Sequence, residues 1–328
     1  MNPPDDKVCG RIKLNVSGPI CCGWSPIGDR LGLADVSAYP WHCWLAQREV
    51  FQEDMIIIEN SAFFPVKLVK DSLGPTHEVK FLFCGPENLG WPTIRRRIYI
   101  IALKRSTFAW AGPMEDEITP HFLDIFSSSV QLDGDCFLLD DDANRREKYQ
   151  QLARGRKMSI SPSVATKDIK LQDLLSGGMR RHFMGYEKKF QQSTSLSSCF
   201  IADLHQSPEE RPACGYMLPT QLTHGLHYSF SAGKLFTPRE LLAAMGQPTF
   251  PQMPNGELWP YNWDALGPSQ LTHASGNTMH GHVLSAVLMY AMAFSAHRSS
   301  GSKMPFLDEA LLTKEQGNDV DEDLDADS

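Results

Sequence analysis

The stretch MIIIEN, residues 55–60, decides the fold class, because a continuous apolar run ends abruptly in a carboxylate and a carboxamide. A short run of this kind, rich in β-branched residues, predicts a strand that is buried on both faces. Residues 79–83 and 98–103 have the same character and predict two further strands. Strands covered on both faces are typical of α/β proteins with a mostly parallel sheet.

The segment before this strand alternates between strand and helix signals. Arg11–Val16 predicts a short strand, and Tyr39–Phe51 predicts a helix with an apolar stripe at Trp41, Trp44 and Leu45. In open sheets of this kind, ligands lie at the carboxyl ends of the strands. We therefore expect the chemistry in the loops that leave those ends.

The second half of the chain has weaker patterns until residue 237. Thr119–Ser129 predicts a helix, and the acidic loop Asp133–Asp142 lacks the spacing of a calcium-binding loop, so no metal site is predicted. Thr237, Pro238 and Glu240 form a helix-capping pattern, and Val283–Ala296 predicts a long helix. The middle of the chain is therefore expected to be a smaller domain inserted into the first.

The composition of the 328 residues, 42% hydrophobic and 21% charged, is typical of soluble globular proteins. The apolar runs are shorter than the roughly 18 residues of a membrane span, and the polar amino terminus does not resemble a signal peptide. We expect an intracellular protein, nuclear if the source is a eukaryote. The eight cysteines contain no C-x-x-C pair, which argues against a disulfide framework and a structural zinc site.

The net charge of −8 is unevenly distributed along the chain. Residues 317–328 hold six acidic residues and no basic one, which leaves −2 for residues 1–316. Residues 144–190 hold twelve Lys or Arg and four acidic residues, a net charge of +8. A basic segment of this size favours a polyanion such as nucleic acid as a partner. A solvated surface segment rich in Lys and Arg is the alternative.

Two loops carry candidate catalytic residues. SGPICCGWSP, residues 17–26, places Cys21 in a Gly-rich loop after the first strand, where an exposed thiol can act as a nucleophile. A buried structural cysteine is the alternative. Glu59 and Asn60 follow the apolar strand, and desolvation there is expected to raise the pKa of the carboxyl group. A glutamate that caps the next turn is the alternative.

A third candidate is the arginine cluster in GWPTIRRRIYIIAL, residues 90–103. At strand spacing, Arg95 and Arg97 share one face and Arg96 the other. Two guanidinium groups on one face form a fork for a phosphate, a carboxylate or a base carbonyl.

Read in order, these segments resemble the cytosine-5 DNA methyltransferase family between about residue 14 and residue 296. That family has a Pro-Cys loop, a Glu-Asn-Val after the next strand, a Gly-x-Pro-Gln-x-Arg-x-Arg segment, a variable target-recognition region, an Arg-Glu-Leu helix and a final Gly-Asn. The matching residues here are Cys21, Glu59-Asn60-Ser61, Gly90–Arg97, Pro219-Thr220, Arg239-Glu240-Leu241 and Gly276-Asn277-Thr278.

The resemblance implies a role for each catalytic candidate. Cys21 would attack C6 of a cytosine flipped out of double-stranded DNA, and Glu59 would stabilise the ring at N3. Arg97, with Arg95, would hold the base carbonyl or nearby backbone, and Asn60 would help to fix the catalytic loop. A cysteine hydrolase that pairs Cys21 with His42 or a later histidine is a separate, weaker hypothesis, because no paired-histidine motif accompanies the cysteine.

The resemblance also implies binding residues. Family members use S-adenosylmethionine, and Asn277 and Thr278 would line one wall of its pocket. The basic segment would meet the phosphates and base edges of the DNA. The residues expected to contact DNA are Arg180, Arg181, Lys188, Lys189 and Arg239.

The sequence departs from the family pattern in and before these motifs. Ile20 replaces the family proline, Cys22 and Thr93 replace glutamines, and Ser61 replaces valine. No Phe-x-Gly-x-Gly loop, which in the family cradles the cofactor, precedes the cysteine loop. The sheet would then lack its opening strands and expose apolar edges. Either the chain is an incomplete reading of a longer gene, or a second chain supplies the missing part, or cofactor binding has been lost.

The expected fold is therefore α/β, a partial doubly wound, Rossmann-like methyltransferase sheet with an inserted smaller target-recognition domain. The expected divisions are a catalytic region at 1–118, a target-recognition region at 119–218, a return to the catalytic domain at 219–300 and an acidic disordered tail at 301–328. The expected function is that of a DNA (cytosine-5-)-methyltransferase. The alternative is an inactive DNA-binding relic or a partner subunit of a split methyltransferase.

Overall fold

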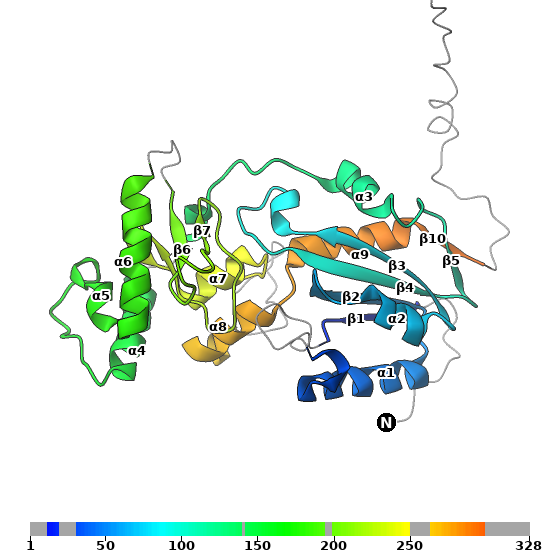
Figure 1. Ribbon diagram of the computed structural model, residues 1–328, viewed down its shortest axis with the longest axis horizontal. Coiled ribbons are helices and arrows are strands. Elements are labelled where there is room, and N and C mark those ends of the chain that lie inside the picture. The colour runs from blue at the N-terminus through cyan, green and yellow to red at the C-terminus, as the bar shows by residue number, and fades with distance from the viewer. Residues whose placement is uncertain (1–11, 20–30, 140–141, 194–198, 250–262, 299–328) are drawn as a thin grey trace, which may run out of the picture.

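The computed structural model describes residues 12–19, 31–139, 142–193, 199–249 and 263–298 (Figure 1). Its larger sheet has the strand order β1-β2-β4-β3. These strands are β1 (Leu14–Ser17), β2 (Met55–Ser61), β3 (His77–Cys84) and β4 (Arg97–Lys104). Each of these four strands overlaps a stretch that the sequence predicted as a strand. The α/β class is confirmed.

The strand directions differ from the expectation of a mostly parallel sheet. β1 and β2 are parallel, with Leu14 opposite Met55, but β4 is antiparallel to both of its neighbours, β2 and β3. The chain passes from β3 to β4 through residues 85–96, which contain no α-helix, and such a connection returns the chain antiparallel to the strand it has left. The expectation of mostly parallel strands was wrong, because an apolar run encodes burial and not direction.

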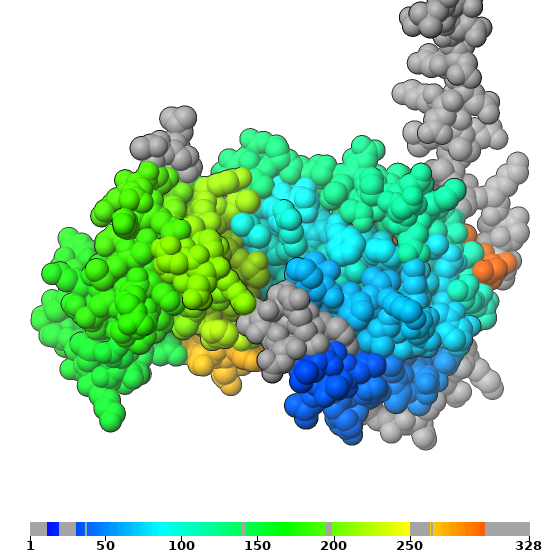
Figure 2. Space-filling view, viewed as in Figure 1, coloured from blue at the N-terminus to red at the C-terminus, as the bar shows by residue number. Residues whose placement is uncertain are grey.

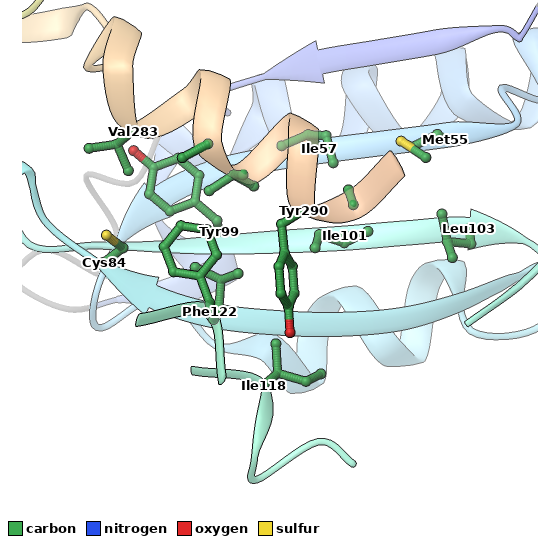
Figure 3. Close-up of a cluster of buried hydrophobic side chains, with 14 of the residues drawn as sticks. Met55, Ile57, Cys84, Tyr99, Ile101, Leu103, Ile118, Phe122, Val283 and Tyr290 are labelled. Atoms are coloured by element: carbon green, nitrogen blue, oxygen red, sulfur yellow. The ribbon is translucent and has the colours of Figure 1, made fainter. Parts of the chain in front are cut away.

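Helices cover both faces of this sheet. α9 (Gly281–Ala293) and α3 (Ile118–Phe126) cover one face, and α1 (Tyr39–Phe51) and α2 (Val66–Leu73) cover the other. Alternate residues of β2 serve the two layers, since Ile57 packs toward α9 and Ile56 toward α1 and α2. Figure 3 shows the first layer, in which α9 contributes Val283 and Tyr290, the sheet contributes Ile57, Tyr99 and Ile101, and α3 contributes Ile118 and Phe122.

The sheet ends at β1 with apolar side chains in solvent. Leu14 and Val16 are opposite Met55 and Ile57 of β2, so they lie on the α9 side of the sheet. Leu14 is 47% exposed and Val16 is 37% exposed. An edge strand with exposed apolar residues is a template for pairing with further chain.

A second, smaller sheet lies beside the first along the longest axis of the molecule (Figure 1). In the space-filling view of Figure 2, the green and yellow-green segments that contain it and its helices form one end of the molecule. Its order is β7-β6-β8-β9, and all of its pairs are antiparallel. Its strands are β6 (Ile201–Asp203), β7 (Cys214–Gly215), β8 (His227–Ser229) and β9 (Lys234–Leu235). The predicted domain boundaries stay predictions, and the small sheet itself extends to Leu235.

Three helices pack against the small sheet. They are α4 (Asp142–Gly155), α5 (Leu171–Leu174) and α6 (Gly177–Gln192), and they lie in the basic segment, where the sequence patterns were weak. Phe183 and Tyr186 of α6 and Tyr149 of α4 are buried in this core. Few apolar residues are enough here, because aromatic side chains bury a large area each.

Two short helices, α7 (Pro238–Ala244) and α8 (Pro268–Asn277), lie between the two sheets. The capping box predicted at the start of α7 is present, since Glu240 N donates to Thr237 Oγ1 over 3.3 Å and Thr237 N donates to Glu240 Oε2 over 2.8 Å. After α9 the chain forms β10 (Ser295–His297), which pairs with β5 (Phe108–Trp110), so the predicted helix overran its end. None of the helices in the described ranges combines the length and apolar composition that crossing a bilayer needs.

Candidate active site

A cavity of about 650 Å³ lies where the parallel strands β1 and β2 end. Gly18 and Pro19 follow β1, and Glu59 to Ser61 close β2. The other walls are Arg95 and Arg97, Thr223, and the last turn of α8. The carboxyl ends of parallel neighbours meet at one edge of a sheet, which is why segments distant in the sequence converge here.

Glu59 and Arg97 form an ion pair in this cavity. Arg97 Nε lies 2.9 Å from Glu59 Oε1, and the side chains are 19% and 9% exposed. β2 and β4 are antiparallel with Ser61 opposite Arg97 and Glu59 opposite Tyr99, so Arg97 is the diagonal neighbour of Glu59 on the same face of the sheet. The register of the sheet therefore fixes the pair.

Asn60 ties the end of β2 to the segment after β1. Its Nδ2 donates to the carbonyl of Pro19 over 3.0 Å, and its Oδ1 accepts from the backbone N–H of Ser61 over 2.8 Å. The side chain is 2% exposed, so both bonds form away from water. Cys21 lies two residues beyond Pro19 and outside the described residues, but the segment that leads to it is held at this cavity.

Arg95 joins two walls of the cavity. It donates from Nη1 to the carbonyl of Gln221 over 3.3 Å and from Nη2 to the carbonyl of Gly276 over 3.1 Å. These walls are in close contact, since a Cβ on Gly276 would lie 2.3 Å from Thr223 N. Arg95 is buried, and its guanidinium group holds the two backbone segments of the cavity wall together.

The predicted facing of the arginines agrees with their positions. Arg95 and Arg97 both line the cavity. Arg96 faces solvent, with its side chain 83% exposed and its Nε 3.5 Å from Glu87.

The two residues expected at the cofactor differ in their position. Asn277 lines the cavity, and its Nδ2 lies 3.2 Å from Nδ1 of His273. Thr278 is not among the described residues that line it, and its hydroxyl donates to the carbonyl of Met279 over 3.4 Å. Glu59 is the only carboxylate among the described lining residues, and it forms an ion pair with Arg97. Of the two residues expected at the cofactor, Asn277 alone is among the described residues that line the cavity.

The described cysteines do not offer a nucleophile at the cavity. Burial raises the pKa of Cys84 and of Cys199 to about 12 and that of Cys136 to about 11, and it also raises the pKa of Cys214. Cys43 is exposed on α1, and none of these five lines the cavity. A thiol with a raised pKa stays protonated and unreactive at neutral pH. Cys21 lies outside the described residues, and its role as the nucleophile stays a prediction.

One acidic group outside the cavity has the composition of a metal site. Ligand atoms of Asp133, Asp135 and Cys199 lie within 4.8 Å of one another. Asp135 accepts a hydrogen bond from the hydroxyl of Ser231 over 2.7 Å, and the thiol of Cys199 donates to the carbonyl of Tyr216. The raised pKa of Cys199 keeps it a thiol, so the group offers two carboxylates and no thiolate.

The structure does not bring the predicted DNA-contacting residues to the cavity. α6 carries Arg180, Arg181, Lys188 and Lys189, and Figure 1 shows it on the side of the small sheet away from the large sheet. Arg239, at the start of α7, lines a separate small cavity. These five positions stay predictions.

Other residues near the cavity were missed by the sequence analysis. Thr223 and His273 line the cavity, and Lys148 and Arg156 of the basic segment line a second cavity to which Thr223 and α8 also contribute. No local pattern distinguishes Lys148 from its neighbours, so only the fold identifies it. His42, the histidine considered for a cysteine hydrolase, is exposed on α1 and is not among the described lining residues.

Neither a family model nor a curated protein sequence matches the chain. Among solved structures, it is similar over 85% of its length to a Spodoptera frugiperda DNMT2 mutant (16% identity, 79% of that chain, TM-score 0.44) and to S. pombe Dnmt2 methyltransferase (15% identity, 78% of that chain, TM-score 0.45). It is also similar over 85% of its length to the Entamoeba histolytica methyltransferase EhMeth (15% identity, 77% of that chain, TM-score 0.47). At this identity the similarities concern the fold.

Proposed function

We propose that the chain is a DNA (cytosine-5-)-methyltransferase, or the larger part of one, that acts through a covalent cysteine adduct. The observation that supports it most is the joint position of three groups at one cavity. Arg97 holds the Glu59 carboxylate there, and Asn60 holds the segment that leads to Cys21. The order of motifs that resembles this family predicts the same three residues as neighbours.

In this mechanism the Cys21 thiolate adds to C6 of a flipped-out cytosine. The new sulfur–carbon bond forms as the C5–C6 π electrons move to C5, which becomes the nucleophile. Glu59 shares a proton with N3 and so balances the charge that develops on the ring, while Arg97 fixes the carboxyl group. Once C5 carries the methyl group, loss of the C5 proton to a base would restore the C5–C6 double bond, and the same electrons would expel the Cys21 thiolate. The base must leave the stack, because neither group reaches it in the duplex.

S-adenosylmethionine would supply the electrophilic methyl group. Asn277 is the one residue of the expected pair at the cavity, so most of the cofactor site must come from residues outside the described ranges or from a second chain. A second chain that adds strands at β1 would also cover Leu14 and Val16. We propose double-stranded DNA as the macromolecular substrate, held in part by Arg180, Arg181, Lys188, Lys189 and Arg239.

The test is covalent trapping. The protein is incubated with S-adenosylmethionine and a duplex that contains 5-fluorocytosine, and separately with a duplex in which 2-pyrimidinone replaces cytosine, since that base accepts a thiol without methyl transfer. A denaturation-resistant adduct is expected with both. Cys21→Ser abolishes the adduct and the matched Cys22→Ser variant keeps it. The absence of both adducts, while a control enzyme reacts, contradicts the catalytic assignment.

Only Asn277 of the two residues expected at the cofactor lines the cavity in the described part of the chain. This favours one alternative, an inactive DNA-binding relic or the partner subunit of a split enzyme. It predicts duplex binding that weakens with salt and does not change in Cys21→Ser. Replacement of Arg180, Arg181, Lys188 and Lys189 by alanine should then remove most of the affinity. Unchanged affinity in that variant contradicts the alternative.

A further inference from the structure

A second cavity, of about 450 Å³, lies between the small sheet and α8. Its walls come from α4, the start of α6, residues 223–226 and the first turns of α8. Lys148, Arg156, His205 and His224 line it, and none of the described residues that line it is acidic. A cavity with cationic and imidazole groups and no carboxylate selects for an anion.

Lys148 is the residue that most strongly favours an anion in this cavity. Its Nζ donates to the amide oxygen of Gln151 over 3.3 Å, and that partner is uncharged. Burial lowers the pKa of Lys148, because the ammonium group loses water there. Glu147, next to it on α4, is exposed and lines a smaller neighbouring cavity that Lys148 also touches. An anion in the larger cavity would supply the charge partner that the ammonium group lacks there.

The amino end of α6 also faces this cavity. Ser176 caps the helix by accepting from the N–H of Met179 over 3.3 Å, and both residues line the cavity. A Cβ on Gly177 or on Gly178 would meet nothing within 4 Å, so the backbone of the first turn is open. The 16-residue helix presents the positive end of its dipole at this wall, which favours an anion.

Arg156, His205 and His224 line the same cavity, and burial lowers the pKa of His205, which favours its neutral imidazole. Arg156 donates from Nη1 to the carbonyl of Leu175, just before the cap of α6. The rings of His205 and His224 meet edge to face, with centroids 5.5 Å apart, at the opposite wall. Basic and imidazole side chains from separate parts of the chain therefore line one volume.

This cavity adjoins the candidate active site. Thr223 lines both cavities, and α8 contributes Ser269 and Thr272 to one and His273 and Asn277 to the other. Ser269 and Asn277 are eight residues apart on that helix, a separation of about 12 Å along its axis at the usual rise per residue. A ligand with several phosphates could contact both.

We propose that this second cavity binds a phosphate group, contributed either by a nucleic-acid backbone or by a free phosphate ester. The proposal goes beyond the methyltransferase function and does not depend on Cys21. Failure of methyl transfer would therefore leave it standing.

The test is titration of the full chain with inorganic pyrophosphate at constant ionic strength, followed by calorimetry. Binding in the millimolar range or tighter is expected. Lys148→Gln should weaken it by about tenfold or more, which is about 1.4 kcal/mol, and Lys148→Arg should keep it. Lys234→Gln, at an exposed lysine of β9 that does not line the cavity, is the matched control and should bind like the parent. Equal unfolding midpoints show that the variants are folded.

A second arm identifies the source of the phosphate. If a duplex oligonucleotide displaces pyrophosphate from the parent protein, the natural ligand is a backbone phosphate. If pyrophosphate and the duplex bind together, the ligand is a free phosphate ester. No pyrophosphate binding, or equal affinity in Lys148→Gln and the parent, overturns the proposal.

Discussion

Arg145 of α4 and Glu240 of α7 form a doubly hydrogen-bonded ion pair inside the protein. Nη2 lies 2.8 Å from Oε1 and Nη1 lies 3.1 Å from Oε2, with side chains 3% and 1% exposed. Glu240 Oε2 also accepts from the N–H of Thr237, so the carboxylate that caps α7 is the one that holds α4. The pair fastens the basic segment to the helix between the two sheets.

Arg145→Met should lower the free energy of unfolding by about 3–5 kcal/mol, because it leaves the Glu240 carboxylate buried without its counter-charge. The double variant Arg145→Met/Glu240→Gln should recover at least half of the loss, since the amide keeps an acceptor for Thr237. Urea denaturation measures both. A loss below about 1 kcal/mol in the single variant would show that the pair contributes little.

Asn60→Asp should slow covalent adduct formation by about 10–100-fold without weakening DNA binding. The carboxylate cannot donate to the carbonyl of Pro19, so the segment before Cys21 loses its tether, and misplaced nucleophiles react slowly. Single-turnover trapping measures the rate. Asn15→Asp in β1 is the matched control, because its Oδ1 is an acceptor from Ser17 and Asp keeps that role. Equal rates in Asn60→Asp and Asn15→Asp contradict the tether.

Ser61→Val should raise the free energy of unfolding by about 1 kcal/mol. The Ser61 hydroxyl is buried and has no hydrogen-bond partner among the described residues, so its removal costs no bond and adds apolar contact. Ser61→Thr, which retains the hydroxyl, should gain less. Denaturant titration compares the three proteins, and a destabilised Ser61→Val would mean that the hydroxyl has a partner.

Stability should fall as the pH drops below about 6.5, the ordinary pKa of histidine. Burial lowers the pKa of His280 to about 3, and it also lowers the pKa of His77 and His227. Between these values the unfolded chain binds a proton that the folded chain does not, so each such group costs about 1.4 kcal/mol per pH unit on acidification.

His280→Asn isolates one of these groups. Asparagine can still cap α9, where His280 Nδ1 accepts from Val283 N. Unfolding midpoints measured from pH 8 to pH 5 should fall less steeply for the variant than for the parent. Parallel curves would show that His280 does not titrate differently in the two states.

Local rules predicted the parts of the fold that depend on neighbours in the sequence. The helix Tyr39–Phe51 has the predicted bounds, and the capping box of Thr237 and Glu240 is present as predicted. The order of motifs also predicted that Glu59, Asn60 and Arg97 would share a site, and they line one cavity. The first two predictions rest on spacing, which a sequence states directly, and the third rests on the resemblance of the motif order to a known family.

The parts that were missed depend on distant partners. The antiparallel course of β4 follows from where the chain turns, and an apolar run does not record it. Arg145 counted as one positive charge of a surface segment, yet it is buried because Glu240, 95 residues later, lies beside it. α4 and α6 were missed because a few aromatic side chains, such as Tyr149 and Tyr186, replace the usual apolar stripe.

Gly276 is the residue at which α8 comes into backbone contact with the segment at Thr223. The segment at Thr223 approaches it too closely for any side chain, and Arg95 grips the carbonyls on both sides of the contact. The two cavities therefore share a wall in which backbone meets backbone at Gly276 and Thr223. Substitutions of the other lining residues can change what each cavity holds, while this contact fixes how closely the segment at Thr223 and α8 approach each other.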